Sequence, residues 1–134
     1  MFYIIILLKG FEICVKESQP HALMSSYNLL NGVHTSERRD LITDILRAEW
    51  GYQGIVMTDW VIGSVKQVKN PRYRNALADR VAAAGGDLFM PGSKSDWQHI
   101  MDALKDGTLS RRQLEENATR VFHMAKKLTE VRHG

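Results

Sequence analysis

The sequence is poor in the features that mark extracellular, membrane-spanning and nucleic-acid-binding proteins. Its 134 residues contain one cysteine, Cys14, so no internal disulfide can form and the fold does not need an oxidising compartment. Eighteen Lys and Arg stand against fifteen Asp and Glu, and the resulting net charge of +3 is too small to indicate a nucleic-acid-binding surface. Only 3 Pro and 10 Gly occur beside 44% hydrophobic residues, which excludes collagen-like and disordered classes. One globular domain spanning residues 1–134 is therefore expected.

Long hydrophobic runs are also missing. The apolar run at residues 1–8 is far shorter than the ~20 residues that a transmembrane helix needs. No basic segment precedes this run and no small-residue cleavage site follows it, so neither a signal peptide nor a membrane interaction is expected. These absences predict a cytoplasmic protein. Apolar residues spaced by three or four positions predict one face of a packed helix instead: Ile4, Leu8, Phe11 and Val15.

Three short apolar runs predict β-strands, at residues 22–27, 55–58 and 88–90. The run at 55–58 lacks polar alternation, which is typical of a parallel strand that is buried on both faces. Tyr27, Asp59 and Met90 end or directly follow these runs at intervals of 32 and 31 residues (59 − 27 and 90 − 59). That interval is the length of one strand–helix unit, and eight units make a (β/α)8 barrel of ~250 residues. Because three strands cannot close a barrel, we expect either a small open α/β protein or part of a barrel.

Helical stretches lie between these runs. Asn31 and Gly32 supply a turn, and Thr35 or Ser36 is expected to cap a helix over residues 37–50. A loop over 61–71 leads to a second helix over 72–84, which Gly85 ends. Two further helices close the chain, because S-x-x-Q patterns that start at residues 95 and 110 are typical of the first turn of a helix.

Candidate functional side chains follow the strands, since parallel α/β sheets gather functional groups at the carboxyl ends of their strands. Asp59 directly follows the second run, where a carboxylate can be a nucleophile, a general base, a metal ligand or a structural group. Trp60 offers a flat face that suits a sugar ring, although tryptophan is also a common packing residue. Tyr27 can donate its hydroxyl to a ligand or anchor a loop.

Metal and cofactor sites are not expected. The five histidines are scattered, without the spacing of a zinc site and without a cysteine partner. No glycine-rich phosphate loop follows a strand, because the pair Gly85 and Gly86 precedes one. We therefore predict no metal and no cofactor.

Two longer motifs resemble a known family. Residues 25–60 read SSYNLLNGVHTSERRDLITDILRAEWGYQGIVMTDW, and residues 82–93 read AAAGGDLFMPGS. In the same order and spacing, the barrel domain of family 3 glycoside hydrolases of the β-glucosidase type has S-Y-N-x-x-N-G, then L-R-x-E-W-G, G-x-V-(M/V)-(S/T)-D-W and A-G-x-D-L-x-M-P-G. The resemblance covers about residues 9–128. It implies a partial (β/α)8 TIM barrel made of the last three βα units with their closing helices.

The resemblance also assigns roles. Asp59 matches the catalytic nucleophile of a retaining hydrolase of β-glucosides, and Trp60 matches the aromatic residue on the aglycone side. Tyr27 matches a tyrosine of the subsite that holds the glycosyl residue, and Met24 is expected to line the same pocket. The Asp-Trp pair favours a β-glucosidase-like enzyme, since bacterial β-N-acetylhexosaminidase relatives tend to have Asp-Asp there.

The chain also departs from the family. In such β-glucosidases the acid/base residue comes from a second domain after the barrel, and this chain is expected to be a truncated domain that ends before it. The upstream Lys-His pair, the sugar-binding Asp and Arg and the first five strands are absent as well. The alternative is a non-catalytic α/β module that associates with itself through open sheet edges. An independent flavodoxin-like binding protein is disfavoured, because the phosphate loop is missing.

Overall fold

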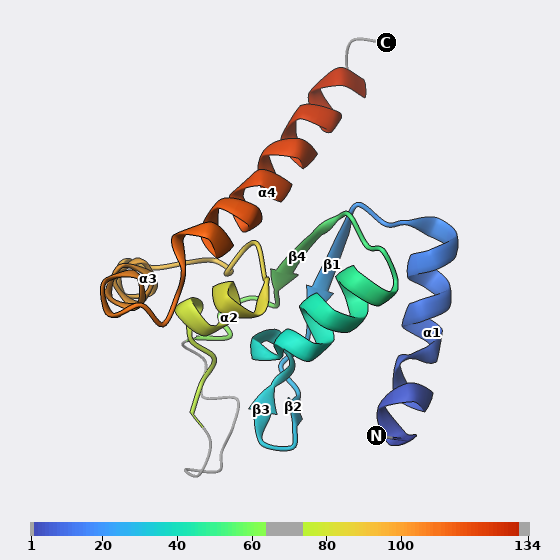
Figure 1. Ribbon diagram of the computed structural model, residues 1–134, viewed down its shortest axis with the longest axis horizontal. Helices are drawn as coiled ribbons and strands as arrows, with labels where there is room; N and C mark the ends of the chain where they lie inside the picture. Colours follow the sequence, from blue (N-terminus) through green and yellow to red (C-terminus); the bar gives the residue numbers. More distant parts are fainter. Residues whose placement is uncertain (1, 64–73, 132–134) are drawn as a thin grey trace.

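The computed structural model describes residues 2–63 and 74–131 (Figure 1). The helical segments are α1 Phe2–Ser18, the short 3-10 turn η1 Thr35–Glu37, the wide π-type helix η2 Asp40–Glu49, α2 Ala78–Ala84, α3 Lys94–Asp106 and α4 Arg111–Val131. The strands are β1 Ala22–Ser25, β2 Leu29–Leu30, β3 Val33–His34 and β4 Ile55–Thr58. Among the helices that the structure describes, none combines the length and the apolar character needed to span a membrane.

The central sheet consists of β1 and β4, which pair in parallel with Ala22 opposite Ile55 and Ser25 opposite Thr58. The third strand predicted at residues 88–90 is reduced to a single parallel bridge between Met57 and Leu88. The strand prediction is wrong there because other groups take the ladder positions. The Thr58 hydroxyl accepts the Met90 N–H at 2.9 Å, and the Val56 carbonyl accepts two successive N–H groups, from residues 87 and 88.

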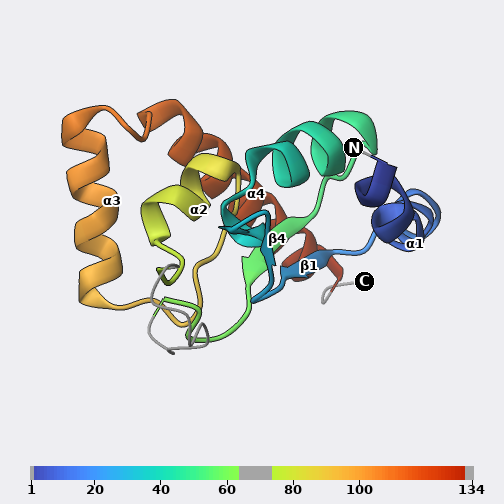
Figure 2. The same cartoon turned by 90° about the horizontal axis from the view of Figure 1, so that it is seen from below.

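One face of the sheet carries the core. Figure 2 shows η2 along this face of β1 and β4, where Val56 and Thr58 are buried. On the opposite face Met57 is half-buried and Met24 is 59% exposed, so the prediction that β4 is buried on both faces is wrong for the described chain. The buried residues that meet under η2 come from distant segments: Val15, Ile42, Trp50, Tyr52, Val56 and Ala84.

The predicted N-terminal helix is confirmed as α1, but only part of its apolar face is packed. Val15 is buried, and Leu8 is packed against the core cluster. Phe11 is 60% exposed, because among the described elements α1 packs only along the edge of β1 and one flank of η2. The side chain of Ile4 lies outside the described part of the structure.

The predicted turn at Asn31 and Gly32 is confirmed, and it closes a small antiparallel hairpin of β2 and β3 that the sequence analysis did not predict. Both residues have positive φ, 52° and 83°, which is the backbone of a type I′ hairpin turn. The predicted helix cap after this hairpin is wrong. The Thr35 hydroxyl donates to the Ser26 carbonyl instead, and η2 begins at Asp40 without a side-chain cap.

The second predicted helix is shorter than expected. Within the described part of this prediction, residues 74–84, α2 is formed by Ala78–Ala84. Residues 64–73, which include most of the predicted loop, lie outside the described residues. The Glu37 carboxylate holds the preceding segment extended, because it accepts the Leu77 N–H at 2.8 Å and pairs with Arg74 at 2.5 Å. Gly85 ends α2 with φ 96°, as predicted.

The two closing helices are confirmed with one shift in register. Ser110 caps α4 by accepting the Gln113 N–H at 3.1 Å, as predicted. The cap of α3 is Ser93 rather than Ser95, because Ser93 has extended backbone and its hydroxyl accepts the Asp96 N–H. α2, α3 and α4 pack together around a small apolar cluster of Ala82, Ala103 and Leu109.

Candidate functional site

The carboxyl ends of β1 and β4 bring Tyr27, Asp59 and Trp60 together. The parallel pairing continues one step beyond β4, where the Asp59 N–H donates to the Ser25 carbonyl at 3.2 Å. The Tyr27 hydroxyl then donates to the Trp60 carbonyl at 2.5 Å, across the two loops. Three residues that the sequence analysis singled out therefore lie side by side at one edge of the sheet.

The Asp59 carboxylate is accessible and only partly hydrogen-bonded. One oxygen, Oδ1, accepts the Trp60 N–H at 2.7 Å, and the side chain is half-buried. Within residues 2–63 and 74–131 the other oxygen, Oδ2, has no hydrogen-bond or ion-pair partner. Side chains alternate along a strand, so Asp59 follows Met57 on the open face of the sheet. A carboxylate oxygen on an open face can attack an electrophile or accept a proton.

The backbone after Asp59 turns sharply and leaves the neighbouring indole in solvent. Val61 has a φ of 54°, which is rare for a β-branched residue, and its N–H donates to the Met90 carbonyl at 2.9 Å. Trp60 is 54% exposed as a result. Met24 lies opposite Met57 in the register of the sheet, on the same open face, and its side chain is also exposed.

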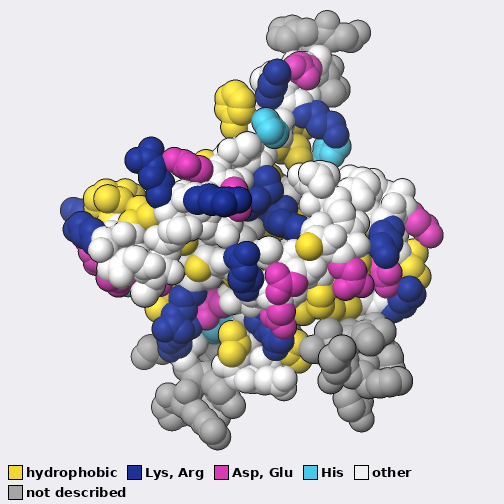
Figure 3. Space-filling model, viewed as in Figure 1, with side chains coloured by type: hydrophobic (Ala, Val, Ile, Leu, Met, Phe, Trp, Pro, Cys, Tyr) yellow, Lys and Arg dark blue, Asp and Glu magenta, His cyan; other side chains and the backbone are white. Residues whose placement is uncertain are grey.

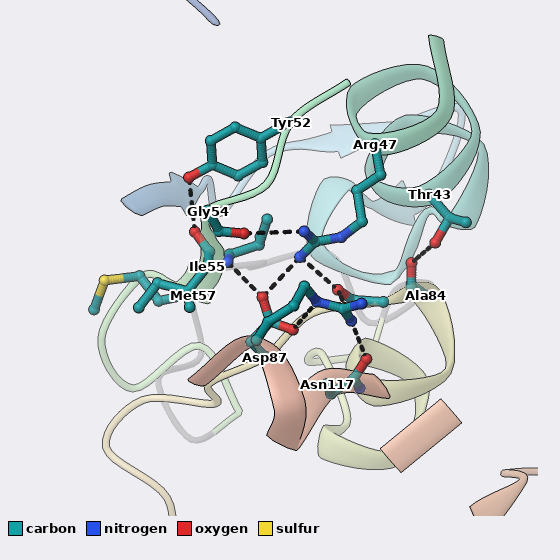
Figure 4. A network of polar contacts seen from close by, with 12 residues as sticks. Thr43, Arg47, Tyr52, Gly54, Ile55, Met57, Ala84, Asp87 and Asn117 are labelled. Carbon is teal, nitrogen blue, oxygen red and sulfur yellow. Dashed lines mark hydrogen bonds and ion pairs between the residues drawn. The ribbon is translucent and has the colours of Figure 1, made fainter. Parts of the chain in front are cut away.

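The opposite end of the sheet holds a polar network that the sequence analysis missed (Figure 4). The Asp87 side chain is 0% exposed and receives Arg47 Nη2 at 2.7 Å on Oδ2 and Arg120 Nε at 2.8 Å on Oδ1. Its Oδ2 also accepts the Val56 N–H at 2.7 Å. Arg47 donates further to the Gly54 carbonyl at 3.0 Å. The network ties η2, α4 and the segment after α2 to the start of β4.

The electrostatics of this network are those of a structural core. Burial lowers the pKa of the Arg47 guanidinium, and the charge of Asp87 opposes that shift. Burial also raises the pKa of Tyr52 to about 12, and its hydroxyl donates to the Ile55 carbonyl at 3.0 Å. Arg47 lies in the L-R-x-E-W-G motif and Asp87 in the G-x-D-L motif, but only the contacts in space show that the two residues form a pair.

A metal centre has no counterpart in the described residues. Over residues 2–63 and 74–131, no three His, Cys, Asp or Glu side chains gather closely enough to hold a metal ion. Cys14 is an exposed free thiol on α1.

Comparison with known proteins places the chain in a family. The family model for the glycosyl hydrolase family 3 N terminal domain matches residues 6–124. The chain belongs to glycosyl hydrolase family 3. The match includes both strands of the central sheet and the candidate site at their carboxyl ends.

Relatives in the family share this segment over only a small part of their length. β-Glucosidase B of Emericella nidulans is 39% identical over 126 residues, 92% of this chain and 13% of the relative. An exo-α-(1→6)-L-arabinopyranosidase of Bifidobacterium breve is 40% identical over 88% of this chain and 14% of its own length. The solved structure of β-glucosidase 3B from Thermotoga neapolitana matches with a TM-score of 0.73 and 37% identity, over 87% of this chain and 16% of that one.

Proposed function

We propose that this family 3 segment supplies the nucleophile of a retaining β-glucosidase-like hydrolase, and that Asp59 is that nucleophile. The observation that carries the proposal is the accessible Oδ2 of Asp59, without a partner in the described chain, at the carboxyl end of a parallel strand. The similarity to proteins named β-glucosidase supports a β-glucoside as the substrate. One relative is named as an arabinopyranosidase, so family membership does not by itself fix the sugar, and glucose as the glycosyl residue is a separate part of the proposal.

In the proposed reaction, Oδ2 of Asp59 attacks the anomeric carbon and the bond to the leaving oxygen breaks. A general acid protonates that oxygen, and a covalent glycosyl–Asp59 ester remains. Water, deprotonated by the same acid/base residue, then releases the sugar and restores the carboxylate. We propose that the acid/base residue is supplied by chain outside these 134 residues, because this chain spans only 13–14% of the first relatives.

The neighbouring side chains are proposed to bind the substrate. Trp60 exposes its indole next to Asp59, in a position to stack on the aglycone. Tyr27, joined to the Trp60 carbonyl, lines the glycosyl subsite and fixes the loop that carries the indole. Met24 adds an apolar wall on the open face of the sheet.

The proposed architecture is the last part of a (β/α)8 barrel. In this arrangement β1, β4 and the segment at Leu88 are three neighbouring strands, and the face that carries Met24 and Met57 is directed to the barrel interior. The second candidate is a non-catalytic module that self-associates, favoured by the two-stranded sheet and the exposed Phe11 on α1. The mass in solution distinguishes the two, since a monomer contradicts self-association.

The test is covalent labelling in a chimera in which residues 9–128 replace the matching segment of the Thermotoga neapolitana enzyme. With 2,4-dinitrophenyl 2-deoxy-2-fluoro-β-glucoside we expect one label per chain, located on Asp59 by peptide mass spectrometry. The chimera with Asp59→Asn is the control and should stay unlabelled. A label on another carboxylate, or a folded chimera without a label, would contradict the proposal.

The isolated chain provides a second arm of the test. General acid–base groups typically contribute ~10²–10⁴-fold to the rate, so we expect no steady turnover of aryl β-glucosides by the 134 residues alone. Steady turnover by this chain would show that it needs no acid/base residue from elsewhere.

A further inference from the structure

A basic hollow lies at the end of the sheet opposite Asp59. It has a volume of about 250 Å³, below the ~300–1,000 Å³ of pockets for drug-sized ligands, and so fits a small ion or metabolite. Three segments that are far apart in sequence form its wall: the approach to β1 with Gln19 and His21, the approach to β4 with Gln53, and α4.

The wall from α4 carries nitrogen donors on one face of the helix. Arg120, His123 and Lys127 recur at intervals of three and four residues, so they lie in one row above the hollow. Figure 3 shows histidine and basic side chains gathered along α4. None of the described residues that line the hollow is acidic, and Gln19 and Gln53 add amide groups.

Pairing on α4 differs between the faces of the helix. Away from the hollow, basic residues are paired with a glutamate one turn on: Arg111 with Glu115, Arg112 with Glu116, and Lys126 with Glu130. Within the described residues Lys127 and the imidazoles of His21 and His123 have no hydrogen-bond or ion-pair partner. A row of donors without acids inside one concave surface is suited to an anion from outside the chain.

One member of the row is held rigidly. The Arg120 guanidinium is fixed by Asp87 at 2.8 Å and by the Asn117 side chain, so its direction is set before any ligand binds. Asp87 shares its charge with Arg47 as well, so this part of the network keeps a net positive charge. A preorganised cation lowers the ordering cost of binding a small anion.

We propose that this hollow binds a tetrahedral oxyanion of the phosphate class, with Lys127, His123, His21 and Arg120 as its donors. A phosphate offers several acceptor oxygens, which matches donors that converge from two segments, the approach to β1 and α4. An imidazole can donate in either tautomer. The ligand is inorganic phosphate or the phosphoryl group of a sugar phosphate. The site lies before the strands begin, so it is independent of the proposed chemistry at Asp59.

The test is an NMR titration of the 134-residue chain with sodium phosphate at constant pH and ionic strength. His99 on α3 is exposed and has no part in the hollow, so it serves as the internal reference. We expect the imidazole signals of His21 and His123 to shift with one shared half-saturation at about 1 mM, an affinity that a few charge-assisted hydrogen bonds can supply. Shifts that grow without saturation, or that include His99 equally, would overturn the proposal.

Two variants sharpen the titration. Lys127→Gln should weaken binding about tenfold, the loss expected for one charge-assisted hydrogen bond. Lys126→Gln is the matched control, because the Lys126 ammonium is next in sequence to Lys127 but is directed to Glu130. This substitution should leave the half-saturation unchanged. Equal weakening by both variants would reduce the effect to general electrostatics and overturn the site. Titration with glucose 6-phosphate distinguishes the sources: tighter binding than inorganic phosphate identifies a sugar phosphate, and equal binding identifies the free ion.

Discussion

Two aspartates at opposite ends of β4 are held in very different ways. The side chain of Asp87 is completely buried near the start of the strand, and both of its oxygens are taken by arginines or a backbone N–H. Asp59, at the carboxyl end, is half-buried and uses one oxygen for the N–H of the next residue. A carboxylate whose oxygens are all occupied can hold elements together but cannot attack a substrate. The end of the sheet that holds Asp87 is therefore structural, and the end that holds Asp59 is the one proposed to react with substrate.

The largest expected effect is on activity, from Asp59→Asn. Asn keeps the shape of the side chain but removes the charge and the nucleophilic oxygen, so the chimera should lose at least ~10³-fold in kcat/KM. Hydrolysis of an aryl β-glucoside measures the loss. In the isolated chain the same substitution should change the free energy of unfolding by less than ~0.5 kcal/mol, because Asp59 has no cation partner among the described residues. Near-wild-type rates would remove Asp59 from the proposed role.

Asp87→Asn should have the opposite profile, a large loss of stability. It leaves Arg47 buried with its charge uncompensated, and breaking a buried ion pair costs about 3–5 kcal/mol. Urea unfolding of the 134-residue chain measures the loss, with Asp44→Asn on the exposed side of η2 as the matched control. If both variants unfolded at the same urea concentration, Asp87 would not anchor this end of the sheet.

The same comparison shows what sequence can predict. The turn at Asn31 and Gly32 and the helix end at Gly85 depend on chemistry within a few residues, so the predictions were confirmed. The start of α2 depends on a hydrogen bond from Leu77 to Glu37, 40 residues away, and no local pattern contains that contact. The reduced strand at residues 88–90 likewise results from contacts with Thr58.

The candidate site divides in the same way. The position of Asp59 at a strand end follows from the apolar run before it, and this much was predicted. The exposure of the neighbouring Trp60 depends on the turn at Val61, whose positive φ is unexpected for a β-branched residue. The Asp87 network was missed because its partners, Arg47 and Arg120, lie 40 and 33 residues from it. The roles given to Tyr27, Trp60 and Met24 stay predictions.

A smaller effect is expected from pH at the structural end. Burial raises the pKa of Tyr52 to about 12, above the ~10 of an unfolded tyrosine. The unfolded chain therefore releases this proton first, so stability is complete below about pH 10 and falls by ~2 kcal/mol as pH approaches 12. Urea unfolding across this range measures the slope. Tyr52→Phe should show a shallower slope, since other groups titrate equally in both proteins, and parallel curves would contradict the assignment.

An effect on stability as small as that of Asp59→Asn is expected from Trp60→Ala, and Trp50→Ala is its matched control. Trp50 is 8% exposed within the core cluster, so its truncation should cost about 3–5 kcal/mol. Trp60 is 54% exposed, and the hydrogen bond that Tyr27 donates to it uses the backbone carbonyl, which alanine retains. Its truncation should cost less than ~0.5 kcal/mol in urea unfolding of the chain, and in the chimera should raise KM more than it lowers kcat. A loss of stability equal to that of Trp50→Ala would make Trp60 a packing residue, and the carboxyl end of the sheet would then be structural in the same sense as the end that holds Asp87.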